Sequence, residues 1–77
     1  MEIDSSGNPY EEIAIPGGHV RVTYIEHGWA DTPSVRIQIR DETGHLRQGP
    51  EIPVAGIGGV VGAVVGLLSK NRVSCTP

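Results

Sequence analysis

Residues 52–68 form one uninterrupted apolar segment, IPVAGIGGVVGAVVGLL, which contains no charged or hydrogen-bonding side chain. Gly58, Gly62 and Gly66 recur in it at every fourth position, so on a helix they would form a single smooth stripe. A helix that is apolar all round cannot rest on a protein surface and must be enclosed by protein or by lipid. In a chain of 77 residues, one molecule can hardly do the enclosing alone. The segment therefore predicts self-association or a membrane.

The same segment predicts a C-terminal helix that depends on close packing. Each of its glycines costs about 1 kcal/mol relative to alanine in a helix interior. A close approach of two backbones offsets such a loss, and the small residues share one face of the helix. We expect this glycine zipper to form an oligomer interface at Gly58, Gly59, Gly62, Ala63 and Gly66. The opposite, bulky face is expected to lie on the sheet of the same chain; it comprises Ile57, Val60, Val61, Val64 and Leu68.

The residues before the helix alternate between apolar and polar side chains, as half-buried strands do. Residues 12–16 alternate briefly and end in the turn signal Pro16-Gly17-Gly18. Residues 19–26 (HVRVTYIE) and 34–41 (SVRIQIRD) alternate over longer stretches and are rich in β-branched side chains. These three stretches are expected to be strands of one antiparallel sheet.

A hairpin turn and a fourth strand are expected after the third. Asp41-Glu42-Thr43-Gly44 is typical of a turn, with Gly44 able to take a positive φ. A short strand between His45 and Val54 would lie at an edge, because Pro50 and Pro53 cannot donate to a sheet ladder. The predicted fold class is α+β, with a four-stranded antiparallel sheet followed by one C-terminal apolar helix (β-β-β-β-α). Residues 11–70 would form a single small domain between a flexible arm at 1–10 and a flexible tail at 71–77.

If the second and third strands pair, one face of the sheet collects basic and hydrogen-bonding side chains. Three guanidinium groups on one face can track a phosphate backbone. The same pattern also suits the solvated side of an antiparallel sheet. Trp29, in the loop at residues 27–33, is either a stacking group for a base or a lid over the edge of a small core. The candidate nucleic-acid-binding residues are Arg21, Arg36, Gln38, Arg40 and Trp29.

Composition excludes several function classes. The net charge of −3 argues against indiscriminate nucleic-acid binding, which depends on neutralising phosphates. The histidines match no short metal-ligand spacing, and Cys75, the only cysteine, permits no internal disulfide. No Ser-His-Asp or Cys-His arrangement can be assembled, so we expect no enzymatic activity, metal or cofactor. No apolar run stands at the N-terminus, which favours a cytoplasmic protein.

The residues VRIQIRDETGHLRQGPEIPV, a strand ending in Ile-Arg, a glycine-containing turn and a short strand leading into the helix, resemble a known family. It is the single-stranded-DNA-binding transcriptional coactivator family of positive cofactor four and its bacterial and phage relatives. The resemblance covers residues 13–68. It implies four curved strands, a helix through which two copies dimerise, and contacts of Arg36 and Arg40 with the backbone of a DNA strand.

Residues 35–68 also look similar to the short actinobacterial regulators that include the sporulation protein BldB. The shared pattern is an alternating strand ending in Arg40-Asp41, then Gly49-Pro50, a short strand and an apolar helix. Both resemblances imply a small regulatory dimer.

The sequence thus predicts a non-enzymatic regulatory or interaction module that forms a homo-oligomer, most simply a homodimer. Its further partner is left open between a single-stranded nucleic acid, as in transcription regulation by DNA binding, and a regulatory protein. The alternative is a small membrane-associated protein, because residues 52–68 lie at the lower edge of what spans a bilayer. Lys70 and Arg72 could then mark the cytoplasmic flank.

Overall fold

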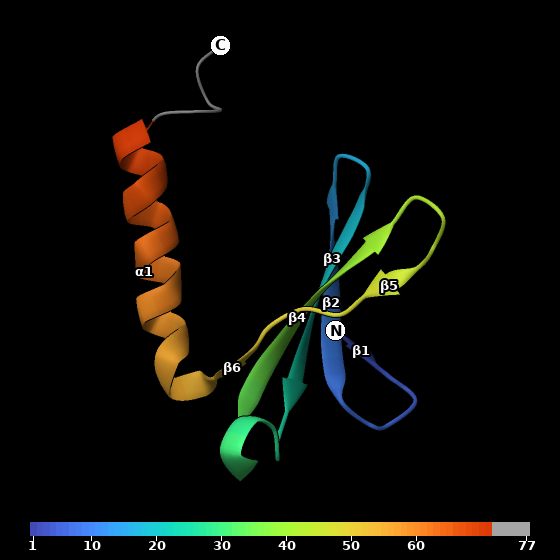
Figure 1. Ribbon diagram of the computed structural model, residues 1–77. Coiled ribbons are helices and arrows are strands. Elements are labelled where there is room, and N and C mark those ends of the chain that lie inside the picture. The colour runs from blue at the N-terminus through green and yellow to red at the C-terminus, as the bar shows by residue number, and fades with distance from the viewer. Residues whose placement is uncertain (72–77) are drawn as a thin grey trace.

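The computed structural model describes residues 1–71, which form one antiparallel sheet and one helix (Figure 1). The strands are β1 (Glu2–Ile3), β2 (Pro9–Ile15), β3 (Gly18–Ile25), β4 (Ser34–Asp41), β5 (Leu46–Arg47) and β6 (Glu51–Pro53). A short 3-10 turn, η1 (Trp29–Asp31), joins β3 to β4, and the helix α1 (Val54–Asn71) follows β6. The sheet order is β1-β2-β3-β4-β5, with β6 also paired to β4. The predicted α+β class is confirmed.

The centre of the sheet is the pairing of β3 with β4, which the alternation of side chains predicted. Val22 lies opposite Ile37, and Arg21 lies opposite Gln38. Residues directly opposite each other in an antiparallel pair share one face of the sheet. We call the side with Val22 and Ile37 the apolar face and the side with Arg21 and Gln38 the polar face. The two predicted faces are therefore present.

The hairpin turn after β4 has the predicted form. Gly44 has a φ of +86°, and its N–H donates to the carbonyl oxygen of Asp41 at 3.0 Å. The Asp41 carboxylate accepts the Thr43 hydroxyl at 2.6 Å and the backbone N–H groups of Thr43 and His45, both at 3.0 Å. These hydrogen bonds, led by that of the Thr43 hydroxyl, hold the pKa of Asp41 below its ordinary value. The turn is thus fixed by an ionised side chain at its first position.

The predicted fourth strand is divided in two by one extra residue. Ile39 pairs with Arg47 and Arg36 pairs with Glu51, so residues 48–50 lie opposite residues 37–38 of β4. An extra residue on one strand is a β-bulge, which breaks the ladder locally and bends the strand. Gly49 lies in this bulge, where an added Cβ would collide with the carbonyl oxygen of Ile37. The bulge therefore requires glycine for a close approach of two backbones.

The predicted number of four strands is wrong, because the structure has six. The bulge accounts for one additional strand and β1 for the other. β1 pairs with the first residues of β2, so the arm expected at residues 1–10 contains paired strand. The Asp4 carboxylate accepts the backbone N–H groups of Ser6 at 2.9 Å and Asn8 at 2.8 Å, which closes the turn between the two strands. Polar residues that are typical of a loose arm serve here as turn formers.

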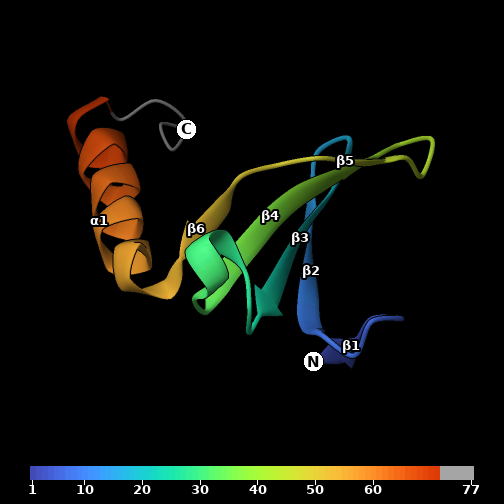
Figure 2. The same ribbon diagram turned by 60° about the horizontal axis from the view of Figure 1, so that its bottom comes forward.

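The helix begins directly after Pro53 and ends at Asn71, close to the predicted bounds. It stands beside the sheet instead of lying on it (Figures 1 and 2). The backbone N–H of Val54 donates to the carbonyl oxygen of Pro33 at 2.9 Å, which fixes the first turn beside the start of β4. No residue of α1 is buried. The expectation that its bulky face covers the chain's own sheet is wrong, since β6 runs into α1 without the two or more loop residues that a reversal needs.

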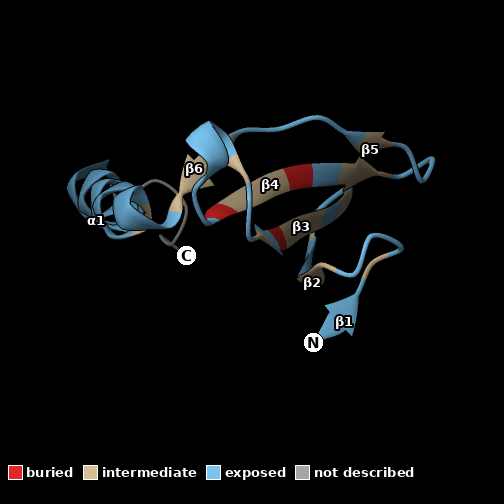
Figure 3. Ribbon diagram, turned by 90° about the horizontal axis from the view of Figure 1, so that it is seen from below, coloured by how far each residue is buried: buried red, intermediate tan, exposed pale blue. Residues whose placement is uncertain are grey.

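The burial of the side chains is the reverse of that in an ordinary small domain (Figure 3). The buried residues are polar: Thr23 is 2 % exposed, Gln38 8 % and Ser34 0 %. Among residues 1–71 no hydrophobic side chain is buried. The radius of gyration is 14.1 Å. A compact chain of this length would have a radius of about 11.5 Å. The molecule is therefore extended and lacks an apolar core of its own.

Candidate functional site

The polar face brings together four of the five candidate nucleic-acid-binding residues. Arg21 lies opposite Gln38, and Arg36 lies opposite Thr23. Arg40, two residues after Gln38 on β4, shares this face by the alternation of the strand. The predicted row of three guanidinium groups therefore exists.

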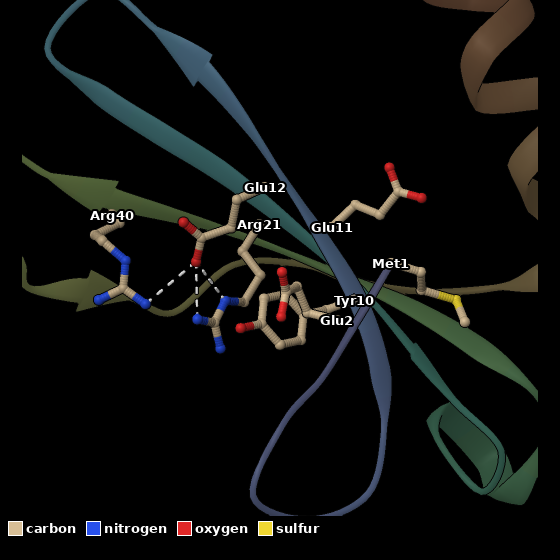
Figure 4. A pocket seen from close by; sticks show the side chains of 7 residues that line it. All are labelled: Met1, Glu2, Tyr10, Glu11, Glu12, Arg21 and Arg40. Atoms are coloured by element: carbon tan, nitrogen blue, oxygen red, sulfur yellow. Dashed lines mark hydrogen bonds and ion pairs between the residues drawn. The ribbon is translucent and has the colours of Figure 1, made fainter.

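Glu12 on β2 occupies the centre of this row. Its Oε2 atom accepts hydrogen bonds from Nε and Nη2 of Arg21, both at 2.8 Å, and from Nη2 of Arg40 at 3.3 Å (Figure 4). The hydrogen bond from Arg21, followed by that from Arg40, holds the pKa of Glu12 below its ordinary value despite an opposing effect of burial. Glu12 is therefore ionised and neutralises part of the positive charge that a phosphate would need.

The third guanidinium group is paired as well. Nη2 and Nε of Arg36 donate to Oε2 of Glu51 at 2.9 and 3.1 Å. Glu51 belongs to β6 and lies directly opposite Arg36. Together with Glu12, it leaves the three arginines a surplus of one positive charge. The polar face is consequently an internal network of ion pairs more than an open cationic surface.

Arg21 has a further partner in Tyr10. Its guanidinium carbon lies 4.0 Å from the centre of the Tyr10 ring, within the range of a cation–π contact. Tyr10 and Arg21 also line a cavity of about 500 Å³, together with Met1, Glu2, Glu11, Glu12 and Arg40 (Figure 4). Three carboxylates and two guanidinium groups line this cavity. Its charge therefore does not favour an anionic ligand.

Trp29 does not join the arginines. It lies in η1 with 61 % of its surface exposed, and its backbone N–H donates to the Ser34 hydroxyl oxygen at 2.9 Å. Its side chain lines a separate cavity of about 660 Å³ at the start of α1, with Tyr24, Ala30, Thr32, Pro33, Pro53, Val54 and Ala55. No arginine is among the residues that line this cavity, which all lie within residues 1–71. The two predicted halves of a nucleic-acid site are thus apart.

The backbone beside Trp29 is strained. Ala30 and Asp31 have φ values of +53° and +59°, in the left-handed region that residues other than glycine rarely adopt. Each such residue costs about 1–2 kcal/mol. Strain of this kind persists only where the surroundings enforce it. Here the Trp29 carbonyl oxygen accepts the Thr32 hydroxyl at 2.7 Å and the Thr32 N–H at 3.0 Å, which closes the turn.

The predicted oligomer interface is fully exposed. Gly58, Gly59, Gly62, Ala63 and Gly66 all lie on α1, and an added Cβ on any of these glycines would meet nothing within 4 Å. Within residues 1–71, nothing therefore packs on the small-residue face. By length and composition α1 could also cross a membrane, a property that it shares with the core helix of many soluble proteins.

The apolar face is a surface that the sequence did not single out as a site. Ile13 is 50 % exposed, Tyr24 41 % and Ile39 45 %. Ile13 lies opposite Val20, and Tyr24 opposite Val35, so these side chains adjoin Val22 and Ile37. The alternation of the strands had identified the face, but it was expected to be covered by α1.

Metal binding finds no support in the described part of the chain. Within residues 1–71 no group of three or more His, Cys, Asp or Glu side chains could hold a metal ion. Cys75 and Arg72, the latter a possible membrane flank, lie outside the described residues, as does most of the expected tail at 71–77.

No protein-family model, curated protein or solved structure matches this chain. The resemblances to the positive cofactor four family and to the regulators that include BldB therefore stay predictions.

Proposed function

We propose that this chain is a soluble, cytoplasmic, non-enzymatic interaction module that works as a homo-oligomer, most simply a homodimer. The observation that carries the proposal is the absence of any buried hydrophobic side chain within residues 1–71. It is joined by two uncovered apolar surfaces on the same chain, the apolar face of the sheet and the helix α1.

Energetics supports assembly over an isolated monomer. Ordering the backbone costs about 1–2 kcal/mol per residue, and burial of apolar surface is the main term that offsets this cost. A chain whose hydrophobic side chains are at best partly buried supplies only part of that term alone. Contact with further copies supplies the rest, and small domains often depend on such help.

A membrane would satisfy only one of the two surfaces. Lipid would enclose α1, whose composition suits it. The exposed side chains of Ile13, Tyr24 and Ile39 would stay in water, because strands with open edges do not enter the hydrocarbon region. Self-association can cover both surfaces, and it is therefore the better account.

The test is the native mass measured by light scattering in buffer without detergent. We expect soluble protein with at least twice the mass of the 8.2 kDa chain over a micromolar concentration range. Folded monomer at these concentrations would contradict the proposal. Recovery only with detergent, together with pelleting in a carbonate wash, would favour the membrane alternative.

Single-stranded nucleic acid is a second candidate ligand, as expected of a transcription regulator. The observation that favours it is the alignment of Arg21, Arg36 and Arg40 on one face of the sheet beside Gln38. A phosphate backbone would have to displace Glu12 and Glu51 from these arginines, so the predicted affinity is low and strongly dependent on salt. Stacking on Trp29 would require a strand long enough to leave this face.

Fluorescence anisotropy with a labelled oligonucleotide tests the second candidate. Binding should weaken as salt is raised, and Glu12→Gln should strengthen it by freeing two guanidinium groups. The matched control is Glu42→Gln, which removes an equal charge in the exposed turn after β4. If a triple alanine variant of Arg21, Arg36 and Arg40 binds as well as the parent chain, the polar face is not the binding surface.

A further inference from the structure

We infer that each helix α1 covers the apolar face of the sheet of a second copy, so that the core of this protein is built only between chains. The inference rests on the proposed homo-oligomer and adds which surfaces meet. The surface that it assigns consists of seven side chains from three strands. These are Ile13, Val20, Val22, Tyr24, Val35, Ile37 and Ile39.

The apolar face is suited to a helix in composition, with two charged side chains at its margins: Glu11 opposite Val22 on β2 and Arg47 opposite Ile39 on β5. Three of its side chains are between 41 % and 50 % exposed, while the opposite face holds the buried residues Thr23 and Gln38. A cavity of about 520 Å³ lies on it, lined by Ile13, Val22, Tyr24 and Val35 together with Met1, Pro9, Tyr10 and Glu11. An apolar, hollowed face fits the bulky side chains of α1, because apolar surfaces gain by leaving water together.

The helix cannot reach this face on its own sheet. Pro53 is the last residue of β6 and Val54 the first of α1, so no loop exists in which the chain could reverse. The hydrogen bond from Val54 to Pro33 further fixes the start of the helix at the end of the sheet. The helix stands off the strands in both Figure 1 and Figure 2. Its bulky side chains are therefore exposed and available to a second copy.

The two surfaces match in length. α1 has 18 residues. At 1.5 Å per residue such a helix is about 27 Å long. β3 and β4 have 8 residues each. At 3.3 Å per residue such strands are about 26 Å long. One helix can therefore span the whole apolar face along its strands.

The area also agrees with an interface between two copies. The chain exposes 5711 Å². A compact monomer of this mass would expose about 4,500 Å². The difference is about 1,200 Å² per chain, or about 2,400 Å² for two chains. It is large enough to supply the roughly 800 Å² that each partner buries in an interface of standard size, and its total lies in the range of obligate homodimers, whose interfaces resemble a domain core cut in half.

The reciprocal exchange also gives the glycine zipper a place. With the bulky face of each α1 on the partner's sheet, the small-residue face points away from that sheet. In a dimer with two-fold symmetry, the two helices can then meet through Gly58 and Gly62.

Directed disulfide formation between two different chains tests the inference. In a Cys75→Ser background, one chain carries Ile37→Cys on the apolar face and a second chain, mass-labelled with ¹⁵N, carries Val61→Cys on α1. The two are mixed in equal amounts, and mild oxidation should give the mixed disulfide in at least tenfold excess over that from the control. The control replaces Ile37→Cys with Gln38→Cys, which is one residue further along β4 on the polar face.

The outcomes separate the inference from the proposed homo-oligomer. A dimer by light scattering without the mixed disulfide overturns the exchange and leaves the oligomer standing. A folded monomer overturns both. A double variant with Ile37→Cys and Val61→Cys that forms its disulfide within one chain at high dilution shows that α1 folds back on its own sheet, and it also overturns the exchange.

An experiment on the natural sequence guards against variants that fail to fold. Chains labelled only at isoleucine δ1 methyl groups are mixed with chains labelled only at leucine methyl groups, and nuclear Overhauser effects between the labels are recorded. The exchange predicts effects from Ile37 or Ile39 of one chain to Leu68 of the other. Effects involving Ile57 alone would show a helix-to-helix dimer and contradict the exchange.

Discussion

The two faces of the sheet differ in whether the chain satisfies them itself. On the polar face, Glu12 and Glu51 lie within hydrogen-bond distance of the arginines, and Thr23 and Gln38 are buried. On the apolar face, Ile13, Tyr24 and Ile39 are left exposed. The difference teaches that this sequence pairs its charges within one molecule but leaves several apolar side chains uncovered there.

A charge on the apolar face should have the largest effect. Ile37→Asp places a carboxylate where the proposed dimer excludes water, and an unpaired charge in such a place costs several kcal/mol. We expect loss of the dimer in light scattering together with loss of cooperative thermal unfolding. Ser6→Asp, in the exposed turn between β1 and β2, is the control and should leave the mass unchanged. A dimer that survives Ile37→Asp would show that this face is not an interface.

A bulky side chain in the glycine zipper should have the next largest effect. Gly62→Leu raises the helix propensity of α1 by about 0.8 kcal/mol, so any loss of association cannot come from melting of the helix. Overpacking at a close helix contact costs about 1–3 kcal/mol. We expect the dissociation constant, measured by analytical ultracentrifugation, to rise at least about fivefold. The dissociation constant of Gly62→Ala should lie between those of the parent chain and Gly62→Leu. An unchanged constant for Gly62→Leu would show that the glycine zipper is not part of the interface.

Acid should lower the stability of the folded chain by protonating Glu12 on the polar face. The pKa of this carboxyl is lowered in the folded chain from the ordinary value of 4.5, chiefly by the hydrogen bond from Arg21. A lowered folded pKa gives stability that is present above the ordinary value and is lost as the pH falls through the folded pKa. Thermal melting of the parent chain should therefore drop more steeply below pH 4.5 than that of Glu12→Gln. Parallel curves would show that this ion pair adds no stability.

Salt should have the smallest effect on association. The direction in which it changes the dissociation constant should show whether apolar surfaces or ion pairs hold the copies together. Sodium sulfate strengthens apolar burial and screens exposed ion pairs. The dissociation constant of the proposed dimer should fall as the salt is raised, measured by sedimentation at fixed pH. A constant that rises with salt would mean that ion pairs, and not the apolar surfaces, hold the copies together.

The sequence predicted those features that depend on neighbouring residues. Alternation from Val35 to Arg40, with Gly44 in the following turn, determined the pairing of β3 and β4 and the two faces. The unbroken apolar run at residues 52–68 predicted α1, which begins at Val54 and continues through Ser69 and Lys70 to Asn71. Each of these signals lies within one element and its adjoining turn, which is why sequence reasoning could identify it.

The features that it missed depend on register between distant residues. Glu12 meets Arg21 because the turn at Pro16-Gly17 sets the pairing of β2 with β3. The same alternation, extended across that turn, would have found the pair. Glu51 meets Arg36 only because the bulge at Gly49 shifts the strand by one residue, which no local pattern indicates. The direction of α1 depends on the missing loop after Pro53, whereas its composition says only that something must enclose it.

The direct passage from Pro53 into Val54 has a consequence for the abundance of the protein in the cell. If the helix can find its cover only on another copy, then dilution and unfolding become a single event, and stability depends on the concentration of the chain. Newly made copies would stay open to proteases until they meet one another. Degradation would then remove the protein at low expression and spare it at high expression, which gives a threshold without any dedicated regulator.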